Sequence, residues 1–201
     1  MADDISGATI QLPVPRTSGV VSVEETLARR RSLREFAAEP LSLAELSQLL
    51  WAAHGITEPG GGYRTVPSAG ALYPLEIYLA LADGFYHHNP RRHTLRRQQK
   101  HDLRQQMAWV ALHQAAVATA PAVLVFCAVF KRTSRTYGRD AQRYVPMEVG
   151  HAAQNVLLQA VALGLGGVPI GAFHEDQMHA LLGLPADHSP LYLIPVGRPQ
   201  A

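Results

Sequence analysis

The sequence contains one cysteine, few aromatic residues and no long apolar run. A single cysteine among 201 residues excludes a scaffold held together by disulfides within the chain. No apolar stretch reaches the roughly 18 residues typical of a membrane-spanning helix. The first residues, MADDISGATIQLPVPRTSG, show no basic segment followed by an apolar core, so no secretory signal is expected. We therefore expect a cytoplasmic protein without a membrane partner.

Charge is also scarce, since charged residues make up 17% of the chain and the net charge is +2 with histidine neutral. That charge is too small to indicate a nucleic-acid partner. Hydrophobic residues make up 47%, which is typical of a folded protein. The length predicts one domain, covering residues 23–201, and residues 1–22 are expected to form an N-terminal arm because they are rich in Pro, Gly, Ser and Thr.

Apolar spacing and turn residues predict a mixed order of helices and strands. The sequence S42-L-A-E45 is a capping box, and Gly55 is expected to end the helix that follows it. The run AVLVFCAVF, residues 122–130, predicts a central buried strand. The remaining expected helices cover 23–31, 101–118, 146–163 and 175–182, and the remaining expected strands cover 76–82, 85–88 and 191–196. This order favours an α+β fold over a doubly wound one.

The expected helix at 146–163 is the longest in the chain. Pro146 suits its first turn, Glu148 suits the same end, and Gly164 is expected to end it. Its apolar residues cover more than one face, so we expect the helix to be buried nearly all round.

The first candidate binding segment is basic and lies at a predicted helix end. Arg30, Arg31, Ser32 and Arg34 place three guanidinium groups and a hydroxyl within five residues. Guanidinium donors match the oxygen geometry of a phosphate group. Residue spacing alone favours a solvated basic helix end over a phosphate site.

Two further candidate segments are made of small residues. Pro67, Ser68, Ala69 and Gly70 would allow the backbone to approach a flat ligand, although an ordinary loop before a strand has the same composition. The segment GLGGVPIGAF, residues 164–173, contains G-x-G but follows a helix, which argues against a dinucleotide fingerprint. Gly171 and Ala172 could still place backbone N–H groups against a ligand.

Other chemistry-bearing residues give weaker signals. The ten histidines show no chelating pair at helical spacing, and Cys127 is expected to be an inert core thiol, so no metal site is predicted. The basic residues between 91 and 104 favour a solvated turn and helix face over an anion-binding adaptor surface. An enzyme without an evident acid, base or nucleophile often relies on an organic cofactor.

Taken in order, several segments resemble the nitroreductase-like flavin family, and within it the branch of SagB/ThcOx-type dehydrogenases. They are RRSLREF, LSLAELSQLLWAAHGIT, YRTVPSAGALYPLEIYLAL, GFYHHNPRRHTL, YVPMEVGHAAQNVLLQAVALGLGGVPIGAF and LYLIPVGRP. The likeness extends from about Glu24 to Pro199. It implies an α+β fold with an antiparallel-rich central sheet flanked by helices, built as an intertwined homodimer with FMN in clefts lined by both chains.

The resemblance also implies roles for individual residues. Arg30, Arg31, Ser32 and Arg34 are expected to contact the FMN phosphate and ribityl chain, together with Arg198. Pro67, Ser68, Ala69 and Gly70 correspond to the loop against the isoalloxazine ring. The loop that covers the ring corresponds to Pro169, Ile170, Gly171 and Ala172. Tyr137 is the expected proton donor.

Two positions differ from the family pattern. The loop Gly70-Ala71-Leu72 lacks an asparagine found in many nitroreductases, and Thr136 stands where azoline-oxidising members carry a lysine before the tyrosine. The implied activity is FMN-dependent hydride transfer through flavin N5. It would be either NAD(P)H-driven reduction of a small nitro or quinone compound, or azoline dehydrogenation on a modified peptide. The alternative is a catalytically inactive flavin-binding scaffold in a peptide-modifying complex.

Overall fold

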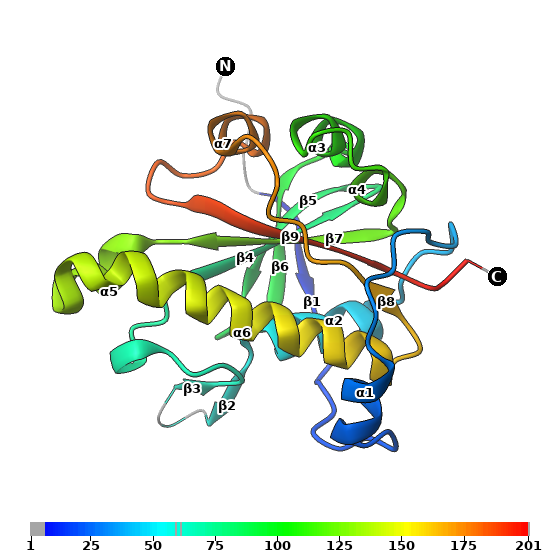
Figure 1. Cartoon of the computed structure of the whole chain (residues 1–201), viewed down its shortest axis with the longest axis horizontal. Coiled ribbons are helices and arrows are strands. Elements are labelled where there is room, and N and C mark those ends of the chain that lie inside the picture. The colour runs from blue at the N-terminus through cyan, green and yellow to red at the C-terminus, as the bar shows by residue number, and fades with distance from the viewer. Residues whose placement is uncertain (1–6, 59, 61, 201) are drawn as a thin grey trace.

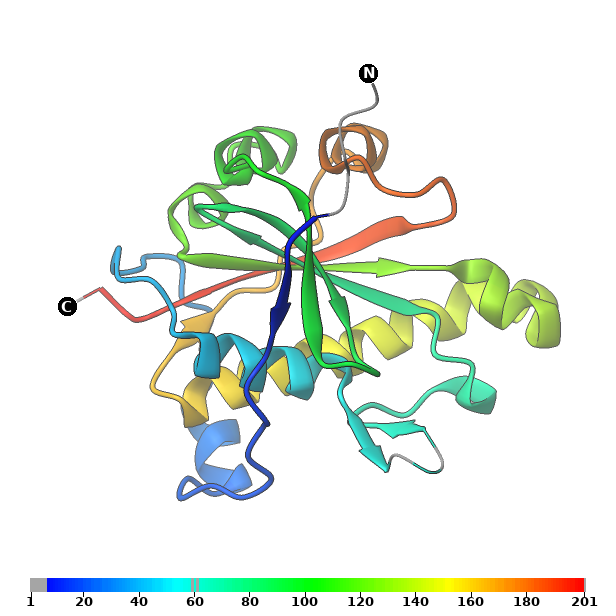
Figure 2. The same cartoon turned by 180° about the vertical axis from the view of Figure 1, so that it is seen from behind.

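The computed structural model describes residues 7–58, 60 and 62–200. A seven-stranded sheet, in the order β1-β6-β5-β4-β7-β9-β8, crosses the middle of the molecule, and each of its pairings is antiparallel. Helices cover both faces of this sheet (Figures 1 and 2). The predicted α+β fold with an antiparallel-rich, helix-flanked sheet is therefore confirmed.

The elements have the following bounds. The helices are α1 (Val23–Arg29), α2 (Leu43–His54), α3 (Arg104–Val110), α4 (Ala115–Thr119), α5 (Phe130–Tyr137), α6 (Ala141–Ala162) and α7 (Glu175–Leu182), with short 3-10 turns η1 (Ala69–Ala71) and η2 (Gly138–Asp140). The strands of the main sheet are β1 (Thr9–Gln11), β4 (Leu75–Leu81), β5 (Gly84–Asn89), β6 (Thr94–Gln99), β7 (Ala122–Ala128), β8 (Gly166–Gly167) and β9 (Ser189–Gly197). A separate hairpin pairs β2 (Ile56–Glu58) with β3 (Tyr63–Arg64).

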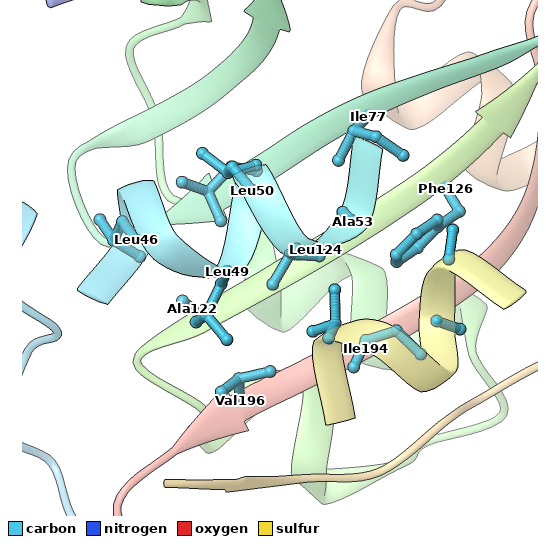
Figure 3. Packing of buried hydrophobic residues seen from close by; sticks show 14 of the residues in the cluster. Leu46, Leu49, Leu50, Ala53, Ile77, Ala122, Leu124, Phe126, Ile194 and Val196 are labelled. Carbon is cyan, nitrogen blue, oxygen red and sulfur yellow. The ribbon is translucent and has the colours of Figure 1, made fainter. Parts of the chain in front are cut away.

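The central strand β7 separates two hydrophobic cores. Successive side chains of a strand point to opposite faces. Leu124 and Phe126 therefore pack in one core with α2 and α6, and Val123 and Val125 pack in the other with α3, α4 and α7. Figure 3 shows the first of these cores, with α2 and α6 lying over the sheet. Because both faces are covered, the strand reads as a continuous apolar run, and the prediction of a buried central strand is confirmed.

The start of α2 also agrees with its prediction. The Ser42 side chain accepts from the Glu45 backbone N–H, and the Glu45 side chain accepts from the Ser42 backbone N–H, which completes the capping box. The helix ends at His54, with Gly55 as its C-cap.

The start of α6 was predicted wrongly. The helix begins at Ala141, and Pro146 lies inside its second turn. A proline there removes one backbone hydrogen bond, to the carbonyl of Gln142. Both Pro146 and Gln142 are exposed, so water can solvate that carbonyl. The chain can thus continue as a helix on both sides of the proline.

The same helix is not buried nearly all round within one chain. Its inner side packs in the core under the sheet, but Met147, Gly150, His151 and Gln154 are exposed on its outer side. We refer to the outward positions Arg143, Met147, Gly150, Gln154 and Leu158 as the outer stripe of α6; Leu158 is partly buried. The repeated spacing of three and four residues places them on one side of the helix.

Two other local predictions fail. The helix expected over 101–118 is two helices, because Leu112 and His113 adopt left-handed φ angles of 56° and 61° between α3 and α4. No glycine or proline marks this turn. Strand β6 was missed because its sequence TLRRQQ carries mostly polar side chains; it pairs with β5 and also with β1, which lies within the predicted arm.

Within the described residues, no helix is both long enough and apolar enough to cross a membrane. Cys127 is buried in β7, and burial raises the pKa of its thiol well above the ordinary value. This agrees with the expected inert core cysteine.

Candidate functional site

The basic segment after α1 lies beside the C-terminal end of the sheet's last long strand. Ser32 forms a parallel bridge with Gly167 of β8, and the Leu33 N–H donates to the Gly167 carbonyl at 3.0 Å. Four residues on, the Ala37 N–H donates to the carbonyl of Arg198 at 3.0 Å. The fold therefore brings the 30–34 segment and Arg198 to the same region, although they lie far apart in the sequence.

Arg198 is half-buried and engaged on two of its three nitrogen atoms. Its Nη2 lies 2.8 Å from Glu45 Oε1, and its Nε lies 3.4 Å from Glu39 Oε2. Its Nη1 is buried and has no hydrogen-bond partner among the described residues. A buried donor without a partner is energetically costly, so this guanidinium edge is suited to accept an anion.

Glu45 joins the capping box of α2 to this arginine. Burial raises the pKa of its carboxyl, but hydrogen bonds from Ser42 and the charge of Arg198 outweigh burial, so the pKa lies below its ordinary value. Glu45 is therefore ionised at neutral pH and holds Arg198 in place.

The three arginines of the 30–34 segment differ in exposure and in hydrogen-bond partners. Arg31 donates to the carbonyls of Ala28 and Arg30, which completes the end of α1. Arg30 is partly buried, and Arg34 is exposed. Arg34 and Ser32 are thus the more accessible donors of the predicted phosphate set.

Residues 169–172 continue from β8 along the edge of β9. Ile170 exchanges two backbone hydrogen bonds of 2.9 Å with Leu193. The carbonyl of Ala172 accepts from the Gln114 side chain at 3.2 Å. A side chain at Gly171 would lie 3.5 Å from the Tyr192 ring. This predicted ring-covering loop is held on both sides, and its Gly171 and Ala172 are exposed.

The 67–70 loop turns sharply before β4. Gly70, Ala71 and Tyr73 have φ angles of 61°, 53° and 46°, and the Ser68 hydroxyl accepts from the Tyr73 N–H at 2.9 Å. Left-handed φ angles at Ala71 and Tyr73 are strained for residues with a side chain, and such strain is found most often at functional sites.

Tyr137 lies against this loop. It is the last residue of α5, and its hydroxyl lies 3.0 Å from the position that a Cβ on Gly70 would take. Its ring meets the Tyr144 ring edge-on, with centroids 5.3 Å apart. The structure thus brings the predicted proton donor and the predicted ring loop together.

A buried polar cluster beneath the same loop was not predicted as a site. Glu148 of α6 and His54 of α2 are 4% and 1% exposed, and Arg64 of β3 lies beside His54. Glu148 was noted only as a favourable residue for the start of a helix. The sequence gives no clear signal for this cluster, because Glu148 is one of several polar residues of α6 and the three residues meet through tertiary contacts alone.

The predicted residues form two groups within one chain. Ser68 lies near the first half of α6, where it lowers the pKa of Glu148. Ser32 pairs with Gly167 just beyond the C-terminal end of α6. From Glu148 to Ala162 the helix rises about 21 Å. Figure 1 shows this separation, with α5 and the β2–β3 hairpin near one end of α6 and α1 and β8 near the other. In a single chain, the residues predicted to bind phosphate and the predicted ring loop at 67–70 therefore lie at opposite ends of α6.

The structure is therefore an antiparallel sheet flanked by helices, with a basic segment beside Arg198 and a small-residue loop beside Tyr137. Comparison with known proteins identifies the family: the model of the nitroreductase family matches residues 27–198. The chain belongs to the nitroreductase family, and the resemblance stated from the sequence is confirmed.

The relatives support this assignment over the whole chain. A provisionally named nitroreductase of Methanocaldococcus jannaschii is 44% identical over 198 residues, covering 96% of this chain and 98% of that protein. The crystal structure of a provisionally named nitroreductase of Ralstonia eutropha superposes with a TM-score of 0.89 at 34% identity, covering 98% of this chain and 91% of that one.

Named activities belong to more distant relatives. The NADPH-flavin oxidoreductase of Vibrio harveyi is 27% identical over 87% of this chain, which spans 65% of that protein. The microcin B17-processing protein McbC of Escherichia coli is 28% identical over 62% of this chain, which spans 50% of that protein. The chain is thus a nitroreductase-family oxidoreductase with similarity to both a flavin reductase and a peptide-processing protein.

Proposed function

We propose that this chain is an FMN-dependent oxidoreductase that works as a homodimer. The observation that carries the proposal is the placement of Arg198 in the same region as the 30–34 segment, where a buried guanidinium nitrogen of Arg198 has no hydrogen-bond partner among the described residues. Family membership and the similarity to the NADPH-flavin oxidoreductase of Vibrio harveyi support it. We further propose that it acts in the cytoplasm.

The residues of the cradle fit the phosphate end of FMN. Ser32, Arg34 and Nη1 of Arg198 would hold the phosphate, and Arg30 and Arg31 would stand beside the ribityl chain. The carboxylates of Glu39 and Glu45 occupy the other nitrogens of Arg198, so one edge of that guanidinium remains for the anion.

The ring would lie between the two small-residue loops. Residues 169–172 would cover it with backbone N–H groups, and residues 67–70 would close against it. When bound, FMN supplies a position, N5, that accepts or donates hydride. The chain's own tasks are to orient the ring, exclude water and place a proton donor, for which we propose Tyr137.

A second copy of the chain would complete the site. Because the two groups of residues lie at opposite ends of α6, an antiparallel pairing of two α6 helices would bring the cradle of one chain to the ring loop of its partner. The outer stripe of α6 fits such a pairing. Met147 is 53% exposed, and a Cβ on Gly150 would meet no described atom within 4 Å outside the neighbouring turns of its own helix.

Among the described residues, no contact outside the neighbouring turns of α6 requires a glycine at position 150. A glycine in the middle of a helix destabilises it by roughly 0.5–1 kcal/mol relative to alanine. A second helix packed closely at this point would explain it. We expect Gly150→Leu to shift the protein from dimer to monomer in sedimentation, whereas Gln177→Leu, at an exposed position of α7, leaves the dimer intact. A dimer in both variants would place the interface elsewhere.

The family resemblance implies two substrate classes. One is a small nitro or quinone compound reduced with NAD(P)H, and the other is an azoline in a modified peptide, which would be dehydrogenated. The similarity over nearly the whole chain to the NADPH-flavin oxidoreductase favours the first. Anaerobic bleaching of the bound flavin by NADPH, followed by reoxidation with a quinone, would support it, whereas turnover of a cyclised peptide would support the second.

An inactive flavin-binding scaffold is the second candidate function. It is favoured by Thr136, which stands where azoline-oxidising members carry a lysine. Flavin that neither NADPH nor a peptide substrate reduces would support this reading.

The central experiment measures flavin retention. Purified wild-type protein should carry FMN at close to one molecule per chain, and Arg34→Ala should lose most of it because the loss removes a charge-assisted phosphate contact. Arg91→Ala, in the exposed turn before β6, is the matched control and should retain FMN. A colourless wild-type protein that does not bind added FMN would refute the proposal.

A further inference from the structure

Three ionisable side chains from separate segments meet below the 67–73 loop. Glu148 comes from α6, His54 ends α2, and Arg64 belongs to β3. Glu148 Oε1 lies 4.0 Å from His54 Nε2, and Arg64 Nη1 lies 2.7 Å from His54 Nδ1. Burying ionisable groups is costly unless they are paired, so a cluster this deeply buried calls for an explanation. Neither the proposed cofactor contacts nor the proposed proton donor uses it.

The guanidinium of Arg64 contacts both ring nitrogens of His54. Arg64 Nη1 lies 2.7 Å from His54 Nδ1 and 3.1 Å from His54 Nε2, and a guanidinium group only donates hydrogen bonds, so the neutral ring accepts from Arg64. Glu148 Oε1 lies 4.0 Å from His54 Nε2. That distance is too long for a hydrogen bond. Glu148 Oε1 consequently has no hydrogen-bond partner in the described part of the chain.

The electrostatics make Glu148 the member that changes charge near neutral pH. Burial and then the charge of Arg64 hold the pKa of His54 well below its ordinary value, so its ring stays neutral. Burial raises the pKa of Glu148 to about 7, against the opposing effects of Ser68 and Arg64. His88, Arg132 and Glu76 act on His54 from farther away.

Tyr73 and Ser68 connect the cluster to the loop. The Arg64 guanidinium lies over the Tyr73 ring at 4.6 Å, and the His54 ring meets the edge of the same ring at 6.0 Å. The Tyr73 N–H donates to the Ser68 hydroxyl, and the Ser68 side chain also acts on the carboxyl of Glu148. Ser68 thus stands between the buried carboxyl and the surface proposed to meet the flavin ring.

We propose that Glu148 is a positioning residue that takes up one proton from solvent when the adjoining site is reduced, acting through Ser68, and releases it on reoxidation. The inference rests on the proposed flavin site. Reduction by hydride brings two electrons and one proton, so the site gains one negative charge. Conversion of the Glu148 carboxylate and one solvent proton to the carboxylic acid balances that charge, and reoxidation reverses both changes.

The test compares holoprotein with Glu148→Gln and with the control Glu58→Gln, whose carboxyl is exposed on β2. Flavin content is measured first, and the two-electron midpoint potential is then measured between about pH 5 and pH 9. For a two-electron couple, one additional proton per reduction steepens the potential by about 30 mV per pH unit. Wild type and Glu58→Gln should show this additional slope above about pH 7, and Glu148→Gln should lack it.

The outcomes separate this inference from the proposed function. Flavin bound in all three proteins, with parallel potential–pH lines, would overturn the role of Glu148 and leave the flavin site intact. Absence of flavin from the wild type would overturn both.

Infrared difference spectra of wild type labelled with ¹³C-glutamate cover the case in which Glu148→Gln does not fold. A glutamic-acid carbonyl band that appears on reduction is expected, and its absence would overturn the proposal. Ser68→Ala should shift that band while keeping it, because Ser68 lowers the pKa of Glu148 without being its proton source.

Discussion

Substitution of Gly70 by alanine tests the contact that joins the ring loop to Tyr137. The φ angle of +61° makes an alanine less favourable by about 1–2 kcal/mol. The added Cβ would also lie 3.0 Å from the Tyr137 hydroxyl and 3.4 Å from its ring. The Tyr144 ring supports Tyr137 on another side, so we expect the contact to cost about a further 1 kcal/mol.

A matched glycine separates the two effects. Gly164 has a φ angle of +72°, and a Cβ there would meet no described atom within 4 Å apart from its chain neighbours. Both alanines also reduce the freedom of the unfolded chain, which offsets about 0.4–1 kcal/mol in each variant. In urea unfolding, Gly70→Ala should therefore lose about 1 kcal/mol more than Gly164→Ala.

A double-mutant cycle with Tyr137→Phe completes the test. Removing the hydroxyl relieves the crowding only when the alanine is present, so the two changes at 70 and 137 should show a coupling energy of at least about 0.5 kcal/mol. Equal losses for Gly70→Ala and Gly164→Ala, together with additive effects in the cycle, would refute the described contact between the loop and the tyrosine.

Three further predictions concern the frame around the site. Ser42→Ala removes the capping box of α2 and should lower the free energy of unfolding by about 1 kcal/mol in urea titrations. Leu49→Ala, at a fully buried position, should cost about 2–5 kcal/mol in the same assay. Hydrogen bonds from His87 and Arg132 outweigh burial and hold the pKa of Glu76 at about 2, so its stabilisation is present above pH ~4.5 and is lost as the pH falls toward 2. Glu76→Gln should abolish this pH-dependent loss of stability, which is on the order of 3 kcal/mol.

Each of these predictions has a control or a contradicting result. Leu43→Ala, at a partly exposed position of α2, should cost less than about 1 kcal/mol, and an equal loss at Leu49 would contradict the packing. Glu58→Gln should lose stability at acid pH to the same extent as the wild type. An unchanged unfolding midpoint in Ser42→Ala would show that the cap contributes little to the whole chain.

Local signals in the sequence correctly predicted the elements that are specified by capping residues or by a continuous apolar run. Ser42, Glu45 and Gly55 specify both ends of α2, and the apolar run from Ala122 specifies a strand covered on both faces. These features depend on hydrogen bonds and burial within a few residues. They could therefore be predicted without knowledge of the rest of the chain.

Other features depend on tertiary contacts and could not be predicted. Leu112 and His113 turn the chain because helices α3 and α4 both pack on the same sheet face, and no turn residue marks the position. Pro146 is tolerated within α6 because Gln142, whose carbonyl loses its backbone partner, lies at an exposed position. His54 and Glu148 come together across 94 positions of sequence, a distance at which neither periodicity nor spacing carries information.

For the candidate site, the sequence and the resemblance supplied the residues. They did not predict that these residues form two groups at opposite ends of α6. The meeting of Ser32 with Gly167 and of Gly70 with Tyr137 is visible only in the fold. The assignments of these residues to FMN stay predictions, and flavin retention in the Arg34 variant tests them.

The placement of the two groups at opposite ends of α6 has a genetic consequence. If each site takes its cradle from one chain and its ring loop from the other, damage to Arg34 and damage to Gly70 in the same dimer need not add. A mixed dimer of one chain with each defect would place both defects in one site and leave the other site whole. Two variants that are each inactive alone should then restore about a quarter of the wild-type sites when co-expressed with random pairing, a form of complementation that a site contained in one chain does not allow.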